Sequence, residues 1–227
     1  MANVGFRINE RIERPCSELV RQFADIPVAN ICDNMGRVFA VHHSIRPFNT
    51  SPLLGVAFTV KVPPGDNLMF HKALDMAQPG DIMAVDGEGS MSHSICGEIM
   101  VRYAMKRGIA GFVIDGCIRD CESLSMHKFP VYAKGVQPKG PYKNGPGEIN
   151  TPVSIGGLVV CPGDILVGDA DGIVVIKPSD AESVLDMAQK HNSKEAQIFI
   201  DIENGSWDRS WIDITLKEKG CELTKLR

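Results

Sequence analysis

The 227-residue sequence has no long apolar run and no run of basic residues, and each absence excludes a class of protein. No apolar segment approaches the ~20 residues that a helix needs to cross a bilayer. Lysine and arginine are scattered, and the formal net charge of -4 argues against a dedicated nucleic-acid surface. The N-terminal segment MANVGFRINERIERP carries charges throughout and is predicted not to be a signal peptide. We therefore expect a cytoplasmic protein that binds neither nucleic acid nor membrane.

The chain also lacks the short motifs that identify many enzymes and metal sites. Its seven cysteines include no C-x-x-C, and Cys117 and Cys121, the nearest pair, have no histidine pair beside them, which argues against zinc. Free thiols of this kind are typical of a reducing cytosol. A P-loop, a G-x-S-x-G motif and a Ser/His/Asp pattern are absent. His71, on a predicted helix, is expected to be structural, whereas for His93, in a Gly/Ser-rich loop, either interpretation is open.

What the sequence does contain is enough apolar material for a real core, with 44% hydrophobic and 23% charged residues. It has no internal repeat and no low-complexity linker. We therefore predict a single domain over residues 1–227. It would comprise a helical N-terminal segment, a core, and a C-terminal helix with a tail, over residues 1–50, 55–178 and 179–227.

Strand patterns alternate with helix patterns through the core. Apolar, β-branched runs predict strands over residues 55–62, 81–87, 111–116 and 129–135, and a series of shorter strands over 153–178. Helical patterns predict helices over residues 17–26, 67–77, 94–107 and 179–202, and a second short N-terminal helix over 29–36 that ends at Gly36. The segments GEGSMSHS and QPKGPYKNGPGEINTP are predicted to be loops. This order favours an α/β fold in the form of a layered ββα sandwich, with helices on its outer faces, over a simple doubly wound sheet.

The most informative stretch is GEIMVRYAMKRGIAGFVIDGCIRD, from Gly97 to Asp120. Glu98 stands at the start of a predicted helix, and Arg119 and Asp120 follow the buried strand that comes next. Because the helix and strand belong to a βαβ unit, the two ends of the stretch can fold back to one place. Two acids suit a hydrated divalent metal, and a guanidinium suits a carboxylate. The stretch therefore suggests an enzyme that acts on small acids.

Each of these residues also has a simpler explanation. Asp120 alone is typical of a helix N-cap or a turn, and Arg119 could form a surface ion pair. Glu98 in a first helical turn stabilises the helix dipole without any catalytic role. The amides of Ile99 and Met100 lie in the same turn, where free backbone donors bind anionic carboxylates well.

Several segments in a fixed order resemble the RraA-like family. They are TVK (59–61), PGDN (64–67), PGDIMAVDG (79–87), GE (97–98), GIAGFVIDGCIRD (108–120) and the later PGDILVGDADGIVVIKP. The family includes 4-hydroxy-4-methyl-2-oxoglutarate aldolases with oxaloacetate decarboxylase activity, and the regulator of ribonuclease E activity. The resemblance spans about Gly55 to Pro178 and implies an RraA-like fold of the swivelling-domain type.

The resemblance also implies a site, that of a class II, metal-dependent pyruvate aldolase whose signature is an acid, twenty residues and Arg-Asp. Asp120 would contact Mg²⁺ or Mn²⁺, and Arg119 would bind the pyruvyl group. The substrate carboxylate would lie beside Gly97, held by the amides of Ile99 and Met100. The substrate would be a small 2-oxo acid that leaves a pyruvate enolate, whose charge a divalent metal and an arginine stabilise.

By the same resemblance, Glu98 is the acid of the signature. It would orient the water that takes the C4 hydroxyl proton and returns a proton to the enolate. The acid of the family is often Asp, and Glu is one methylene longer. Lys61 could serve as a Schiff-base lysine, but it is the less favoured candidate, because metal-dependent cleavage requires no such lysine.

The alternative function is that of a regulator that acts on a ribonuclease by protein contact. The enzyme is favoured, because a pure interaction module needs no array of Glu98, Arg119 and Asp120. A methyltransferase is disfavoured, because no Gly-rich nucleotide loop follows the first strand. The resemblance further implies a homotrimer or a hexamer with sites near the subunit interfaces.

Overall fold

The computed structural model describes residues 3–222, which fall into two compact units. The first unit ends at Ala188, and the second begins at Gln189. The second unit contains the C-terminal part of α6 (Ala181–Glu203) and all of α7 (Ser210–Glu218). Within residues 3–222, no helix combines the length and the apolarity that a membrane span requires.

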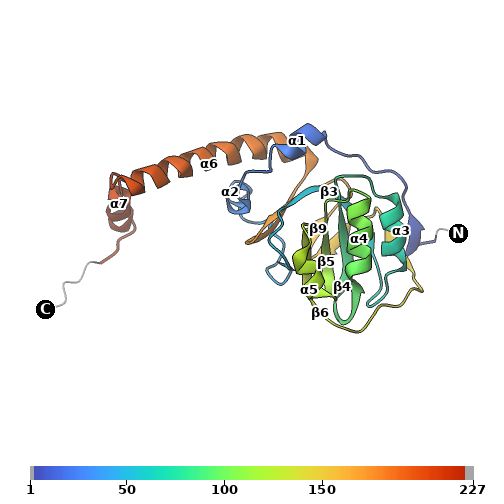
Figure 1. Cartoon of the computed structure of the whole chain (residues 1–227). Helices are drawn as coiled ribbons and strands as arrows, with labels where there is room; N and C mark the ends of the chain where they lie inside the picture. The colour runs from blue at the N-terminus through green and yellow to red at the C-terminus, as the bar shows by residue number, and fades with distance from the viewer. Residues whose placement is uncertain (1–2, 223–227) are drawn as a thin grey trace. The chain divides into compact units, whose positions relative to one another are not determined.

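A nine-stranded mixed sheet forms the centre of the first unit (Figure 1). Its strand order is β1-β7-β3-β4-β5-β6-β2, and a β10–β11 hairpin is attached to β3. The four central strands run parallel, and they are β3 (Leu53–Lys61), β4 (Asp81–Cys96), β5 (Gly111–Ile118) and β6 (Val131–Val136). The remaining strands of this sheet are β1 (Phe6–Ile8), β2 (Arg46–Pro47), β7 (Gly147–Ile149), β10 (Ile165–Asp169) and β11 (Gly172–Ile176).

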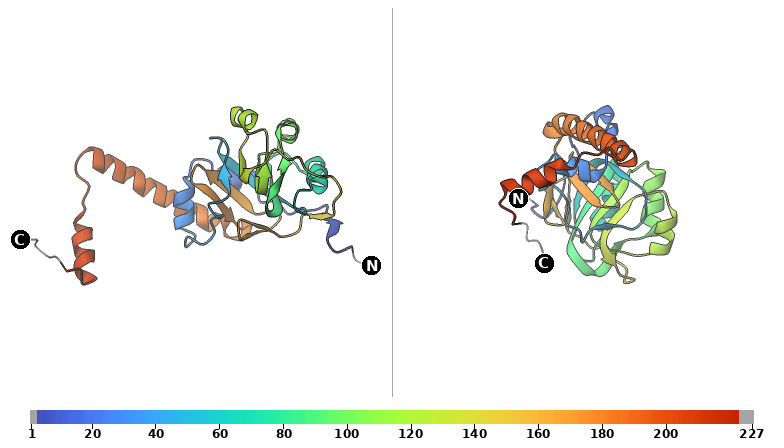
Figure 2. Two further views of the ribbon diagram at one scale, coloured as in Figure 1. Left: turned by 90° about the horizontal axis from the view of Figure 1, so that it is seen from below. Right: turned by 90° about the vertical axis from the view of Figure 1, so that its left-hand side faces the viewer.

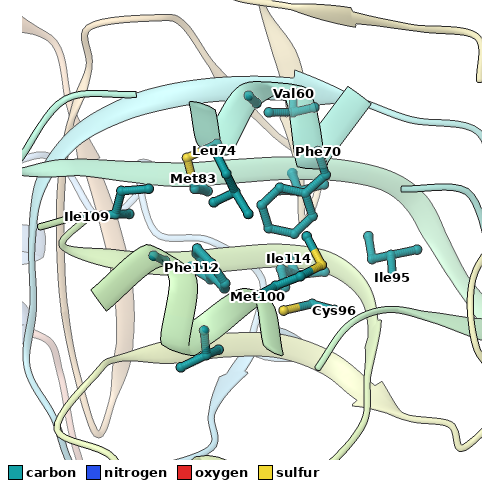
Figure 3. Close-up of a cluster of buried hydrophobic side chains, with 14 of the residues drawn as sticks. Val60, Phe70, Leu74, Met83, Ile95, Cys96, Met100, Ile109, Phe112 and Ile114 are labelled. Atoms are coloured by element: carbon teal, nitrogen blue, oxygen red, sulfur yellow. The ribbon is translucent and has the colours of Figure 1, made fainter. Parts of the chain in front are cut away.

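Three helices connect the parallel strands and cover one face of the sheet (Figures 1 and 2). They are α3 (Leu68–Met76), α4 (Glu98–Lys106) and α5 (Cys121–Met126). Their apolar sides meet the sheet in one buried cluster, in which Phe70 and Leu74 of α3 and Met100 of α4 face strand residues such as Phe112 and Ile114 (Figure 3). The ring of Phe112 packs edge-on against that of Phe70, with centroids 5.2 Å apart. This interlocking fixes the helices on the sheet.

The opposite face of the sheet carries a second β layer. The hairpin of β8 (Val153–Ile155) and β9 (Leu158–Val160) packs there on small apolar side chains such as Ala57 and Ala84. Two buried carboxylates anchor the hairpin, since Asp86 accepts a hydrogen bond from the Ser154 amide at 3.2 Å and Asp115 accepts one from Gly156 at 2.8 Å. The layers are therefore β, β and α, and the predicted ββα sandwich is confirmed.

The N-terminal helices are shorter than predicted. Helix α1 spans Ser17–Arg21, whereas a helix is predicted over residues 17–26, and α2 spans Val28–Asp33, close to the second short helix predicted over residues 29–36. Turns replace the second half of the first predicted helix, and they still bury Phe23 and Ile26 against β10, β11 and the start of α6. The apolar spacing therefore predicts the buried positions correctly but overestimates the length of the helix.

Two segments that are predicted to be loops contain strand residues instead, and the first of them positions the site. The segment GEGSMSHS is part of β4, whose last residues pair with β5 in the register Ser94–Cys117 and Cys96–Ile118. Helix α4 consequently begins at Glu98 and not at residue 94. The segment over residues 137–152 contains β7, which pairs antiparallel with β3. Strand pairing overrides the glycine- and proline-rich composition at both places.

Candidate active site

The ends of β4 and β5 bring the two halves of the Gly97–Asp120 stretch together. The two strands are parallel neighbours, so their carboxyl ends lie at the same edge of the sheet. The Arg119 amide donates to the carbonyl of Cys96 at 2.9 Å, which extends the pairing by one residue. Gly97, Arg119 and Asp120 therefore meet at the place where open α/β sheets usually bind ligands.

Asp120 is held in an unusual backbone conformation that turns its carboxylate toward α4. Its φ of 60° and ψ of 34° lie in the left-handed region, which aspartate tolerates better than most residues. Its Oδ2 accepts a hydrogen bond from the Glu98 amide at 3.0 Å. This bond ties the carboxylate to the N-terminus of α4, where the helix dipole favours a negative charge.

Gly97 leaves the space that this contact needs. Its backbone is extended, with φ of -155°, so any residue could adopt it. A β-carbon there would nevertheless lie 2.5 Å from Asp120 Oδ2 and 3.1 Å from Cγ of Arg119. Glycine at this position is thus explained by the close approach of two side chains and not by backbone strain.

Arg119 and Asp120 line a cavity of about 220 Å³. Their side chains are 41% and 42% exposed, so a ligand can reach both. The Arg119 Nε lies 3.7 Å from Asp120 Oδ2, and the backbone of Gly140 lies close to the other end of the guanidinium. A cation and an anion are therefore presented side by side at one wall. The end of β4, helix α3 with the residue before it, the start of α4 and the loop after β6 contribute the rest of the lining, namely Asn67, His71, Cys96, Gly97, Ile99, Met100, Pro141 and Lys143.

The two amides predicted to hold a carboxylate are in different situations. The Met100 amide donates to the carbonyl of Gly97 at 3.1 Å, so the first turn of α4 already occupies this donor. The Ile99 amide has no hydrogen-bond partner within residues 3–222. The Ile99 side chain is 78% exposed at the cavity, whereas Met100 is buried. Ile99 is therefore the free donor of this turn.

The Glu98 carboxylate does not line the cavity. Its Oε1 accepts a hydrogen bond from Nε of Arg102 at 2.6 Å and lies 3.7 Å from Nε2 of His127. A hydrogen bond from Ser123 and then the contacts with Arg102 lower the pKa of this carboxyl. Ser123 belongs to α5, and His127 follows it, so the Glu98 side chain joins α4 to α5 while its backbone amide holds Asp120.

The structure adds cavity residues that the chemical motifs did not single out. Asn67 is buried, donates to the carbonyl of Ile95 at 3.0 Å, and keeps its Oδ1 without a partner among the described residues. Burial, and next the charge of Lys143, lower the pKa of His71. The sequence signal for Asn67 was the PGDN segment, whereas His71 had been expected to be structural and Lys143 lay in a predicted loop.

The donor set fits a divalent cation that keeps most of its water. No three His, Cys, Asp or Glu side chains gather into a metal cluster within residues 3–222. Burial raises the pKa of the Cys96 thiol, and a buried thiol is a poor match for a cation that prefers oxygen ligands. Asp120 is left as a single accessible carboxylate. Mg²⁺ is commonly bound by one or two carboxylates together with water and substrate oxygens, so a single accessible carboxylate is compatible with Mg²⁺ or Mn²⁺.

Comparisons with known proteins show the family and the fold. The model of the RraA-like family, described as Aldolase/RraA, matches residues 28–175. A protein of Halalkalibacterium halodurans, named "Putative 4-hydroxy-4-methyl-2-oxoglutarate aldolase", is 38% identical over 78% of this chain and 85% of its own length. The solved structure of Streptomyces coelicolor RraAS2, described as an unusual member of the RNase ES inhibitor RraA protein family, has a TM-score of 0.72 and 28% identity. That match covers 81% of this chain and 97% of RraAS2.

A third similar protein carries a different name. The solved structure of an S-adenosylmethionine:2-dimethylmenaquinone methyltransferase from Geobacillus kaustophilus has a TM-score of 0.63 and 30% identity, covering 66% of this chain and 94% of that chain. The similar proteins thus carry the names of an aldolase, a ribonuclease inhibitor and a methyltransferase. A choice among these activities has to rest on the side chains of the site.

Proposed function

This chain belongs to the RraA-like family, and we propose that it is a metal-dependent carbon–carbon lyase. Its substrates would be 2-oxo acids of the 4-hydroxy-4-methyl-2-oxoglutarate type, which it cleaves to pyruvate, and it would also decarboxylate oxaloacetate. The observation that supports this most directly is the adjacent placement of Arg119 and Asp120 at one small cavity, beside the free amide of Ile99. A binding module has no need for this combination.

Substrate binding follows from the charges at the cavity. The Ile99 amide and the Arg119 guanidinium are donors for the 1-carboxylate and the 2-oxo oxygen of the substrate. Asp120 would hold the divalent cation, largely through water, and the Glu98 amide keeps that carboxylate turned to the cavity. When bound, such a cation supplies Lewis-acid stabilisation of negative charge on the 2-oxo oxygen.

The reaction then needs two proton movements. The C4 hydroxyl gives up its proton, the C3–C4 bond breaks, and its electron pair forms the enolate of pyruvate. A proton added at C3 completes the first pyruvate, while C4 with its methyl and carboxyl groups becomes a second one. Arg119 stabilises the charge that develops on the enolate oxygen, because its guanidinium is held in place before the reaction begins.

The role of Glu98 in proton transfer stays a prediction, because its carboxylate faces α5 and not the cavity. We propose that Glu98 positions the site instead. Its amide fixes Asp120, and its side chain fixes α5, which begins directly after Asp120. The role is indirect, since no atom of the Glu98 side chain lines the cavity.

The test is pyruvate release by the purified protein with Mg²⁺ or Mn²⁺, before and after treatment with EDTA. We expect activity with either metal, loss with EDTA, and loss of at least about 100-fold in Asp120→Asn. Asparagine can still accept the Glu98 hydrogen bond, so this variant removes the charge and spares the geometry. Asp25→Asn, an exposed acid on another part of the chain, is the control. Full activity in Asp120→Asn, or activity that EDTA leaves unchanged, would refute the metal assignment.

A second candidate function is inhibition of a ribonuclease by protein contact. It is supported by the similarity to RraAS2, which extends over 97% of that chain. Asp120→Asn separates the two functions, because inhibition by a surface should survive the loss of one cavity charge. Ribonuclease inhibition that is equal in the wild type and in Asp120→Asn, with no pyruvate release by either, would favour the regulator.

A further inference from the structure

Helix α3 contributes a histidine to the cavity, and we propose that this residue, His71, is the acid–base group of the cleavage reaction. Its imidazole would take the proton of the C4 hydroxyl and return a proton to C3 of the enolate. This inference rests on the proposed lyase function. It assigns a role that the Glu98 carboxylate does not fill from its place beside α5, and it starts from the lining of the cavity, to which His71 belongs.

Few of the side chains that line the cavity can accept a proton. Arg119 and Lys143 carry hydrogen-bond donors only. Asp120 is the proposed metal ligand. Burial raises the pKa of the Cys96 thiol above its usual value, so this thiol keeps its proton near pH 7. Among the lining residues that the structure describes, His71 is therefore the group left for proton transfer.

Helix α3 presents the His71 side chain to the cavity. The His71 amide donates to the carbonyl of Asn67 at 3.0 Å, so the two residues lie one turn apart on the same side of the helix. Asn67 is held at the cavity wall, because its Nδ2 donates to the carbonyl of Ile95 at 3.0 Å and lies 3.4 Å from Sδ of Met100. Since the backbone of a helix is covered by its own turns, the part of His71 that borders the cavity is its side chain.

The imidazole of His71 is open to a ligand. His71 also borders a second hollow, of about 250 Å³, which residues of α3 and α4 line. Within residues 3–222, no hydrogen bond or ion pair engages its ring nitrogens. Asp75, the acid one turn further along α3, accepts instead from the hydroxyl of Tyr103 on α4 at 2.8 Å. The ring nitrogens are thus available for a substrate proton, as a general base requires.

The groups around His71 keep its imidazole neutral near pH 7. Burial, and next the charge of Lys143 in the loop after β6, lower the pKa of His71, and the opposing effect of Asp75 is smaller. The other charged groups of the cavity, Arg119 and Asp120, lie 3.7 Å from each other and offset one another. A neutral imidazole can accept a proton, and the resulting imidazolium can return it.

The proposed transfer balances over the reaction. His71 takes the C4 hydroxyl proton as the C3–C4 bond breaks, and the electron pair of that bond forms the enolate. The imidazolium then donates the proton to C3, which yields pyruvate and a neutral His71. Because the cavity measures only about 220 Å³, C3 and C4 of a substrate held at Arg119 stay within the space that His71 borders. Oxaloacetate forms the same enolate by loss of CO₂ and has no hydroxyl proton to give up.

The test compares His71→Gln with the wild type on these two reactions, with Mg²⁺ present. We expect kcat for cleavage of 4-hydroxy-4-methyl-2-oxoglutarate to fall by about 100-fold or more, the contribution of a positioned acid–base group. KM should stay within about threefold, because the lost group acts mainly in the transition state. Oxaloacetate decarboxylation should fall by less than about tenfold, because water can protonate the enolate in place of His71. Its retention also shows that the variant is folded.

The pH dependence provides a readout that a structural role would not change. The wild-type kcat for cleavage should fall as pH drops below about 6.5, since the protonated imidazole cannot accept the hydroxyl proton. This decline should be absent from the remaining activity of His71→Gln. A decline caused by protonation of Asp120 would appear with oxaloacetate as well, so the two substrates tell the groups apart.

His43→Gln is the matched control, because His43 is an exposed histidine that does not line the cavity, and this variant should behave as the wild type. Cleavage by His71→Gln at more than about a tenth of the wild-type rate would overturn the inference and leave the lyase proposal intact. Equal losses in both reactions, or an unchanged decline at low pH, would overturn it as well. Failure of the wild type to release pyruvate from either substrate would refute the lyase proposal, and this inference with it.

Discussion

Replacement of Gly97 by alanine should remove activity while leaving the fold nearly intact. The added β-carbon would lie 2.5 Å from Asp120 Oδ2, and real β-carbons essentially never approach another heavy atom closer than 3.0 Å. The carboxylate must therefore retreat by at least half an ångström. The same β-carbon would lie 3.2 Å from Arg119 Nε, so both charged groups of the proposed site are displaced by one methyl group.

The expected magnitudes differ between activity and stability. A misplacement of about 1 Å at a reacting centre costs on the order of 100-fold in rate, so we expect a fall of that size in kcat/KM. The retreat also lengthens the 3.0 Å bond from the Glu98 amide. A hydrogen bond to a charged group contributes ~1.5–3 kcal/mol, but Asp120 is 42% exposed and water replaces part of it. We therefore expect the free energy of unfolding to fall by about 1 kcal/mol or less.

The assays are pyruvate release and denaturant unfolding, with Gly116→Ala as the control. Gly116 lies on β5 close to Arg119, and a β-carbon there meets no atom closer than 3.5 Å, at the side chain of Ile95. Gly116→Ala should keep both activity and stability. Full activity in Gly97→Ala would refute the view that the close approach of Asp120 and Arg119 to this backbone shapes the site. Unfolding of Gly97→Ala would show that the steric cost reaches the sheet.

Three further predictions concern stability. Arg14→Ala leaves the buried Asp81, which Arg14 contacts at 2.8 and 2.7 Å, without its charge partner; urea unfolding should show a loss of about 3 kcal/mol, and a loss below ~1 kcal/mol would contradict this. Phe112→Ala removes a buried ring that packs edge-on against two others, and we expect a loss of ~3–5 kcal/mol in the same assay. Burial and the charge of Lys143 lower the pKa of His71 from 6.5, so the unfolded state binds this proton more readily, and wild-type stability should fall as pH drops below about 6.5. His71→Gln should flatten this decline. Identical pH slopes of stability in the two proteins would refute the lowered pKa of His71.

The order of elements was predictable because the core of the fold follows simple periodicity. The buried strands over residues 81–87 and 111–116 are short apolar runs, and the helix between them ends at a glycine. Such a strand–helix–strand unit has nearly one handedness, so the ends of the two strands had to lie side by side. The unit therefore predicts that Gly97 comes near Arg119 and Asp120, although the extension of β4 to Cys96 that completes this meeting was not predicted.

The extension of β4 and the strand β7 were not predictable, because long-range pairing creates them. The GEGSMSHS segment contains glycine and serine, which are poor strand formers. It joins the sheet because β5 offers partners as far as Ile118 and because Lys139, remote in sequence, accepts from both the amide and the hydroxyl of Ser94. Lys143 is hidden for the same reason, since its loop is tied to α3 by contacts more than 70 residues apart in sequence.

Glu98 shows why a spacing motif can place a residue next to a cavity and still leave its role open. A fixed spacing constrains the position of a residue along the chain. It does not say whether the backbone or the side chain of that residue serves the site. At Glu98 the two parts point to different tasks, since the amide holds Asp120 at 3.0 Å while the carboxylate contacts Arg102 and the region of α5. An acid at the first position of α4 is favoured by the helix dipole in any case. The spacing is therefore explained by the main chain alone, and the choice of an acid by the link between α4 and α5. On this interpretation an aspartate at position 98 would preserve the amide contact and shorten the reach toward Ser123 and His127.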